Sequence, residues 1–181
     1  MFNVSEEIGK IITTGNIKTA LDLWAGRWQR SLLCANAWVK TIAVDNGNMP
    51  MWQFDQTLLD NTNISFIQSN IEEYLLEKNN GFDLILLINV IAFIKKENFL
   101  SDILIKITNS VNPQWYLLLS FFFDDDPTMQ WPNTNFYTFD DFAFLKDEFD
   151  VIKEDDIRND DLHKPYGAHK HHMWYLIIRK K

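Results

Sequence analysis

The sequence predicts an α/β fold: a doubly wound, mostly parallel seven-stranded sheet with helices on both faces, in which residues 1–181 form a single domain. Two observations predict this fold. Short runs that are apolar almost throughout alternate with longer amphipathic segments, a pattern typical of parallel strands that are covered on both faces. The apolar fraction is 46%, and no internal repeat or low-complexity linker divides the chain, so one sizeable core is expected.

The apolar runs mark the expected strands. The first is expected at residues 20–24, with the sequence ALDLW. The second, at residues 38–45, contains the β-branched side chains of Val39, Ile42 and Val44, which suit a strand. The remaining strands are expected at residues 64–68, 82–90, 115–123, 149–153 and 173–179.

Amphipathic segments between these runs predict the helices. Ser5 is a good N-cap for a first helix over residues 5–13, which places Ile8 and Ile11 on one face. Pro50 suits the first turn of a helix over residues 49–59. Further helices are expected at residues 28–36, 71–78, 95–110 and 140–147.

Composition limits the classes of partner. The net charge of −8 repels phosphate backbones, so no nucleic-acid partner is expected. No apolar stretch approaches the roughly 20 residues that span a bilayer, and the N-terminal segment does not resemble a signal peptide. Cys34 is the only cysteine, which excludes an intramolecular disulfide and fits a reducing compartment. We therefore expect a cytoplasmic protein without a membrane partner; the oligomeric state is not predicted.

Polar residues follow the first four expected strands at the edge where doubly wound sheets bind ligands. Asp22 and Gly26 lie at the end of the first strand and in the turn after it. Asp45 ends the second strand about 20 residues later, where an acidic side chain can accept hydrogen bonds from ribose hydroxyls. Asn70 follows the third strand, and Asn89 ends the fourth.

Several segments, in this order and spacing, resemble one family. LDLWAGRWQRS at residues 21–31 stands where that family has roughly LDLGCGxGRxS, and TIAVD at residues 41–45 stands at its second strand. Further matching segments are QSNI at 68–71, FDLI at 82–85, NVIAFI at 89–94 and FYTFDDF at 136–142. The chain thus resembles class I S-adenosylmethionine-dependent methyltransferases, in particular the tellurite-resistance (TehB-like) branch.

The resemblance implies S-adenosylmethionine as cofactor and a small molecule as methyl acceptor. Gly26 would approach the methionine portion, and Asp45 would hold the ribose. Asn70 and Ile71 would meet the adenine, and Asn89 would line the methyl-donor cleft. The implied cofactor-binding set is Asp22, Trp24, Gly26, Asp45, Asn46, Asn70, Ile71 and Asn89.

Simpler structural roles stay open for Asp45, Asn70 and Asn89, of which Asn89 could be only a polar group at a strand end. Asp45 could cap the turn at Asn46 and Gly47, and Asn70 could act only as an N-cap for the helix that follows it. Asp83, which opens the fourth strand, is expected to be a surface or capping carboxylate.

Trp24 and Trp28 replace two glycines of the family's first loop. Glycine permits a positive φ and lets a ligand approach the backbone, whereas an indole in the pocket would exclude the methionine end of the cofactor. Two hypotheses follow: an active enzyme whose indoles turn away from the pocket, or a catalytically inactive methyltransferase fold that serves as a binding or structural protein. A third is that the loop binds a different small ligand by stacking.

All four histidines lie in residues 161–172, which are expected to form a loop before the last strand, near the substrate cleft. His169 and His171 are the candidate catalytic residues, as a general base or in binding of the acceptor. Both would point to one side of a strand at a spacing that can hold a transition metal, but an exposed loop is favoured and no metal site is assigned. The acidic run at residues 124–126 could bind a cation; a solvated turn is favoured.

Overall fold

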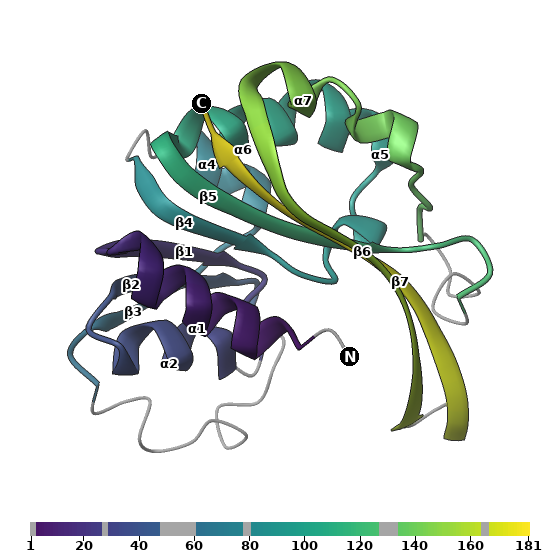
Figure 1. Ribbon diagram of the computed structural model, residues 1–181, viewed down its shortest axis with the longest axis horizontal. Helices are drawn as coiled ribbons and strands as arrows, with labels where there is room; N and C mark the ends of the chain where they lie inside the picture. The colour runs from purple at the N-terminus through teal and green to yellow at the C-terminus, as the bar shows by residue number, and fades with distance from the viewer. Residues whose placement is uncertain (1–2, 27–28, 48–60, 78–80, 127–133, 164–166) are drawn as a thin grey trace.

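The computed structural model describes residues 3–26, 29–47, 61–77, 81–126, 134–163 and 167–181 (Figure 1). These residues form a seven-stranded sheet in the order β3-β2-β1-β4-β5-β7-β6. The strands are β1 (Thr19–Leu23), β2 (Lys40–Asp45), β3 (Ile64–Gln68), β4 (Phe82–Leu87), β5 (Val111–Phe122), β6 (Phe149–His163) and β7 (Gly167–Lys180). Strands β1 to β5 run parallel, and β7 lies antiparallel between β5 and β6. The predicted doubly wound, mostly parallel sheet is confirmed.

The helices lie between the strands as expected, with local differences. They are α1 (Val4–Gly15), α2 (Gln29–Asn36), α4 (Ile71–Glu77), α5 (Lys96–Asn98), α6 (Leu104–Ser110) and α7 (Leu145–Glu148), with further helical turns η2 (Ile91–Phe93), η3 (Phe99–Ile103) and η5 (Phe139–Phe142). Asn3, not Ser5, caps α1, because its side chain accepts hydrogen bonds from the N–H groups of Ser5 and Glu6. The expected helix at 49–59 lies outside the described residues. In the described part of the chain, no helix is long and apolar enough to cross a bilayer.

The two faces of the sheet bury separate sets of helices. Helices α1 and α2 cover one face, whereas α4, η3, α6 and α7 cover the other (Figure 1). Strand β4 serves both, since Leu84 and Leu86 pack toward α1 while Ile85 and Leu87 pack toward α6. Each such leucine contributes about 1.5–3 kcal/mol by leaving water. A strand buried at every position explains why its sequence is continuously apolar.

The last two strands are longer than the sequence predicts. The expected bounds were 149–153 and 173–179, but β6 continues to His163 and β7 begins at Gly167. Of the described residues, those of β7 before His172 pair only with β6, so the two strands extend beyond the sheet as a ribbon (Figure 1). The expectation of a loop is therefore wrong for residues 161–163 and 167–172, which belong to the two strands; residues 164–166 lie outside the described part of the chain. The polar sequence of these strand segments lacks the apolar alternation that marks a strand in a sequence.

A buried carboxylate fixes the amino-terminal edge of the sheet. One oxygen of Asp83 accepts hydrogen bonds from the N–H groups of Lys18 (2.9 Å) and Thr19 (3.0 Å). The other oxygen accepts one from the Asn112 side chain at 3.2 Å. The sequence left two roles open for Asp83, a surface carboxylate or a capping carboxylate. The structure shows the capping role, and the side chain is buried. It joins the start of β1 to β4 and β5.

Trp38 offers a direct test of backbone strain. It follows α2 with a φ of 66°, its N–H donates to the Ala35 carbonyl at 3.0 Å, and its side chain is 83% exposed. Glycine adopts this left-handed conformation without steric cost, so Trp38→Gly should raise the free energy of unfolding by about 1 kcal/mol. Urea denaturation measures the change. Trp38→Ala, which keeps the Cβ, should not gain this stability, and an equal gain in both variants would contradict the explanation.

Candidate functional site

A cavity of about 390 Å³ lies at the carboxyl ends of the parallel strands. Asn46 reaches it from the end of β2, and Asn70 and Ile71 reach it from the end of β3 and the start of α4. Trp24 and Phe93, which follow β1 and β4, form an aromatic part of its wall. The strand order reverses between β1 and β4, so the cavity lies at the switch point where sheets of this kind bind ligands.

A smaller cavity of about 180 Å³ lies next to it, between the loop after β1 and the end of β4. Gly26 and Asn89 line it. The resemblance implies Gly26 for the methionine portion of the cofactor and Asn89 for the methyl-donor cleft. Gln29 and Arg30 line it from the start of α2 and were not predicted. Arg30 is the cationic side chain of its lining, which suits a carboxylate ligand. Trp24 lines this cavity as well as the larger one.

Asp45 supports the loop rather than lining either of these two cavities. One carboxylate oxygen accepts a hydrogen bond from the Gly26 N–H at 2.9 Å, and the other accepts one from the Gly47 N–H at 3.2 Å. Its side chain is nearly buried, with 7% of the residue exposed. The carboxylate thus caps the turn after β2, which is the structural role left open for Asp45 by the sequence. It also joins this turn to the loop after β1.

Asp22 lies beneath the loop and is also absent from the lining of the two cavities. Its residue is 1% exposed, and its carboxylate accepts a hydrogen bond from the Ser31 hydroxyl at 2.5 Å. Burial raises the pKa of the Asp22 carboxyl, which the Ser31 hydrogen bond opposes. This contact holds the start of α2 against β1, so Asp22 positions the loop from below.

Asn89 is held in a strained conformation by a residue that the sequence did not single out. Its φ is 59°, and the predicted strand over residues 82–90 ends earlier, at Leu87. The Asn89 N–H donates to the Ser120 hydroxyl oxygen at 2.9 Å, and this hydroxyl donates to Asn89 Oδ1 at 2.8 Å. The available signal was a lone serine within the apolar run WYLLLSFFF of β5.

The Trp24 indole remains in the cleft. Its backbone has a φ of 71°, the left-handed conformation that glycine would adopt most easily. The ring stacks on Phe93 with centroids 6.3 Å apart and an interplanar angle of 11°. Of the two tryptophans that replace glycine, Trp28 lies outside the described residues.

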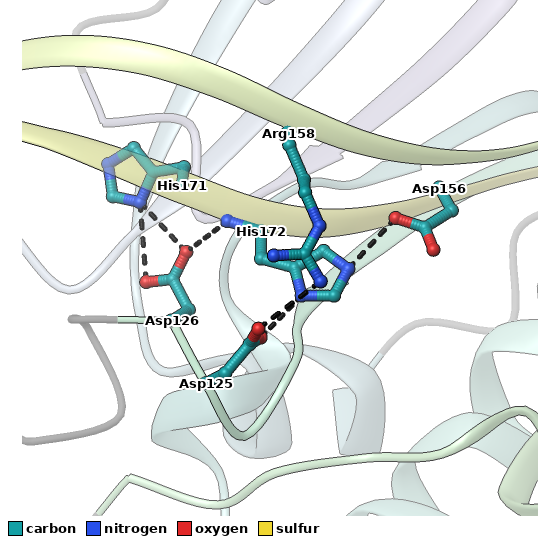
Figure 2. A network of polar contacts seen from close by, with 6 residues as sticks. All are labelled: Asp125, Asp126, Asp156, Arg158, His171 and His172. Carbon is teal, nitrogen blue, oxygen red and sulfur yellow. Dashed lines mark hydrogen bonds and ion pairs between the residues drawn. The ribbon is translucent and has the colours of Figure 1, made fainter.

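A second group of polar residues gathers where β5 ends beside β7 (Figure 2). Asp126 is buried, and its two oxygens lie 3.0 Å and 3.3 Å from His171 Nδ1. The same carboxylate accepts a hydrogen bond from the His172 N–H at 2.7 Å. The expectation of a solvated turn at residues 124–126 is wrong for Asp126, because the turn folds back onto β7. His169 also belongs to β7, but its side chain is outside the described part of the chain.

His172 is enclosed by acidic and aromatic groups, as Figure 2 shows for the acidic ones. Its Nδ1 contacts Asp125, its Nε2 lies 2.9 Å from Asp156, and its ring stacks on Phe123 at 4.1 Å. Each ring nitrogen of His172 therefore faces a carboxylate. Arg158 adds a cation 3.3 Å from Asp125. Within the described residues, no group of His, Cys, Asp or Glu is arranged to hold a metal ion.

The contacts of His172 predict a pH-dependent contribution to stability. The hydrogen bond from His172 lowers the pKa of Asp125, so this stabilisation is present above the unfolded pKa of about 3.9 and is lost as the pH falls through the lower folded value. His172→Asn should lower the free energy of unfolding by about 1 kcal/mol at pH 6, because the carboxylates are half exposed. The difference from wild type should shrink toward pH 3.

Urea denaturation of the two proteins between pH 3 and pH 7 checks this prediction. Arg158→Met is the matched control, because its more exposed guanidinium contacts the same carboxylate and should matter less. A loss for His172→Asn that is independent of pH would contradict the assignment.

No protein-family model matches the sequence, and no curated protein matches it. Solved structures match it over almost its whole length. TehB from Haemophilus influenzae has 17% identity and a TM-score of 0.79, and the match covers 97% of this chain and 62% of TehB. This chain therefore spans less than two thirds of TehB.

Two further structures are named as methyltransferases. Burkholderia thailandensis 1,6-didemethyltoxoflavin-N1-methyltransferase, with 1,6-didemethyltoxoflavin and S-adenosylhomocysteine bound, has 19% identity and a TM-score of 0.71; the match covers 98% of this chain and 76% of that one. The N-methyltransferase NodS from Bradyrhizobium japonicum WM9 has 11% identity and a TM-score of 0.74, with 97% and 93% covered. At these identities the likeness concerns the fold: the chain has the Rossmann-like fold of S-adenosylmethionine-dependent methyltransferases and is similar in structure to TehB.

Proposed function

We propose that this chain binds S-adenosylmethionine across the two cavities and transfers its methyl group to a small-molecule acceptor. The observation that carries this proposal is the division of the predicted residues between adjoining cavities. Asn70 and Ile71, implied to meet adenine, line the larger one, and Gly26 and Asn89, implied to meet the methionine portion and the methyl-donor cleft, line the smaller one. Both cavities lie at the switch point of the sheet.

The residues of the chain would mainly bind and orient. When bound, the cofactor supplies an electrophilic methyl group on a sulfonium centre. Asn46 and Asn70 offer amide donors and acceptors to the adenosine portion, and Arg30 offers a guanidinium to the carboxylate of the methionine portion. Asp45 is proposed to serve the ribose, in addition to holding the loop through Gly26. Alignment of this kind is the protein's main contribution to a direct displacement.

Bound ligands of the structural neighbours support the same cofactor and class of acceptor. The Burkholderia enzyme holds S-adenosylhomocysteine together with a small molecule, and NodS has been crystallised with S-adenosylhomocysteine. The composition of this chain agrees with a small acceptor rather than nucleic acid, because its net charge is −8. A screen of small molecules for methyl transfer would identify the acceptor.

We propose His171 as the general base for an acceptor that loses a proton from N–H or O–H. The buried carboxylate of Asp126 contacts His171 Nδ1, which favours a proton on that nitrogen and directs basicity to Nε2. His171 packs against Phe122, two residues beyond Ser120, which holds Asn89. His169 is proposed for acceptor binding in the same part of β7.

The role of His171 predicts that binding and catalysis separate. His171→Gln should leave the affinity for S-adenosylhomocysteine unchanged, and it should lower the rate of methyl transfer to an acceptor found by screening by about 10²–10⁴-fold. Calorimetry measures the first quantity, and steady-state kinetics measure the second. A variant with unchanged kcat would remove His171 from the chemistry.

Titration with S-adenosylhomocysteine and with adenosine tests the cofactor proposal by calorimetry. Wild-type protein should bind S-adenosylhomocysteine, and Arg30→Met should weaken this binding about 10- to 100-fold, because a charge-assisted hydrogen bond contributes about 1.5–3 kcal/mol. Adenosine has no carboxylate, so its affinity should not change.

Arg179→Met is the matched control for Arg30→Met. Arg179 pairs with Asp150 at 3.4 Å. It lies on β7 opposite Tyr116 of β5, next to the edge strand β6. If Arg30→Met weakens adenosine binding as much as S-adenosylhomocysteine binding, the proposed orientation is wrong. If neither wild type nor the control binds S-adenosylhomocysteine, the catalytically inactive alternative is favoured.

A further inference from the structure

The Trp24 indole stands at the junction of the two cavities. Among the described residues, it alone lines both. Asn70 lies in the lining on one side and Asn89 in the lining on the other. A cofactor that reaches from the adenine side to the methionine side must therefore pass this ring.

We propose that Trp24 is a gate: stacked on Phe93, its indole keeps the cofactor cleft closed, and the cleft opens when the ring leaves that stack. This inference rests on the proposed function, because it states how the same site is regulated. The nearly parallel rings, 6.3 Å apart at 11°, form an offset stack that defines the closed position. The ring is only partly buried against the core, so it has an exposed side toward which it can turn.

The backbone around Trp24 does not need to move for the gate to open. The N–H groups of Trp24 and Ala25 both donate to the Val44 carbonyl, at 2.9 Å and 3.0 Å. The next N–H, that of Gly26, donates to the Asp45 carboxylate at 2.9 Å. These bonds fix the main chain to the end of β2, so opening is a rotation of the Trp24 side chain about its own torsions. The left-handed φ of 71° is retained in both positions.

A gate of this kind affects ligands unequally. When only the open state binds a ligand, the apparent affinity is reduced in proportion to the open fraction. S-adenosylhomocysteine needs both cavities, so its apparent affinity is reduced in this way. Adenosine can occupy the larger cavity of about 390 Å³ while the ring stays stacked, so its affinity is not reduced. The gate therefore predicts that the closed protein discriminates against the complete cofactor in favour of its nucleoside part.

Replacement of the indole tests the gate with S-adenosylhomocysteine and adenosine as probes in calorimetry. Trp24→Gly also suits the local φ. It removes part of the wall of the larger cavity, which acts on both ligands alike, so the gate predicts that the affinity for S-adenosylhomocysteine rises about tenfold or more relative to the affinity for adenosine. Trp38→Gly is the matched control: it makes the same substitution at a second left-handed position, which is 83% exposed and lines neither cavity. It should bind both probes as wild type does.

Phe93→Leu is the second variant, because it removes the stacking partner and keeps Trp24. It should raise the affinity for S-adenosylhomocysteine in the same direction, and it decides the question if Trp24→Gly does not fold. The gate requires that wild type also binds S-adenosylhomocysteine, but more weakly than either variant. Binding by the gate variants alone would overturn it, because the indole would then close the cleft permanently, as the catalytically inactive alternative expects.

Three further results would overturn the proposal. Equal affinity of wild type and Trp24→Gly for S-adenosylhomocysteine removes the gate and leaves the cofactor proposal standing. Weaker binding by Trp24→Gly shows that the indole is a wall on which the ligand stacks. Absence of S-adenosylhomocysteine binding in wild type and in both gate variants overturns the gate and the proposed function together.

Discussion

Three consecutive backbone N–H groups, those of Trp24, Ala25 and Gly26, bind the end of β2, and the shape of the site depends on this attachment. The Val44 carbonyl accepts the first two, and the Asp45 carboxylate accepts the third. These hydrogen bonds fix residues 24–26 of the loop after β1, and both cavities are built against this segment. A loop organised in advance loses little further conformational entropy when a ligand binds. The cost of binding then falls mainly on side chains.

Much of the fold could be predicted because burial leaves a mark in the sequence. Strand β3 has the expected bounds, Ile64–Gln68, and β4 was found because it is apolar at every position but one. The second strand begins two residues later than expected, because Trp38 turns the chain with a positive φ that its apolar side chain does not reveal. The extended β6 and β7 leave no such mark, since hydrogen bonds between polar strands need no apolar face.

The site was predictable in residue type and only partly in arrangement. Gly26 and Asn89 reach a cavity as expected, because the carboxyl ends of parallel strands meet at one edge. Asp22 does not, because Ser31 draws its carboxylate beneath the loop. The contact between His171 and Asp126 joins residues that lie 45 positions apart, so no local pattern announces it. The orientation of an aromatic ring depends on its neighbours, which the sequence does not give.

The end of β6 and the start of β7 form a ribbon, and the described contacts between this ribbon and the rest of the sheet lie at its base. There the Phe123 N–H donates to the His172 carbonyl, and Asp126 holds His171 and His172. Because the outer residues of β7 pair with β6 alone, paired residues can be added to or removed from the two arms without shifting the register of the central strands. The length of the ribbon, and therefore the surface that it can contact, can change during evolution without a change in the central strands of the sheet.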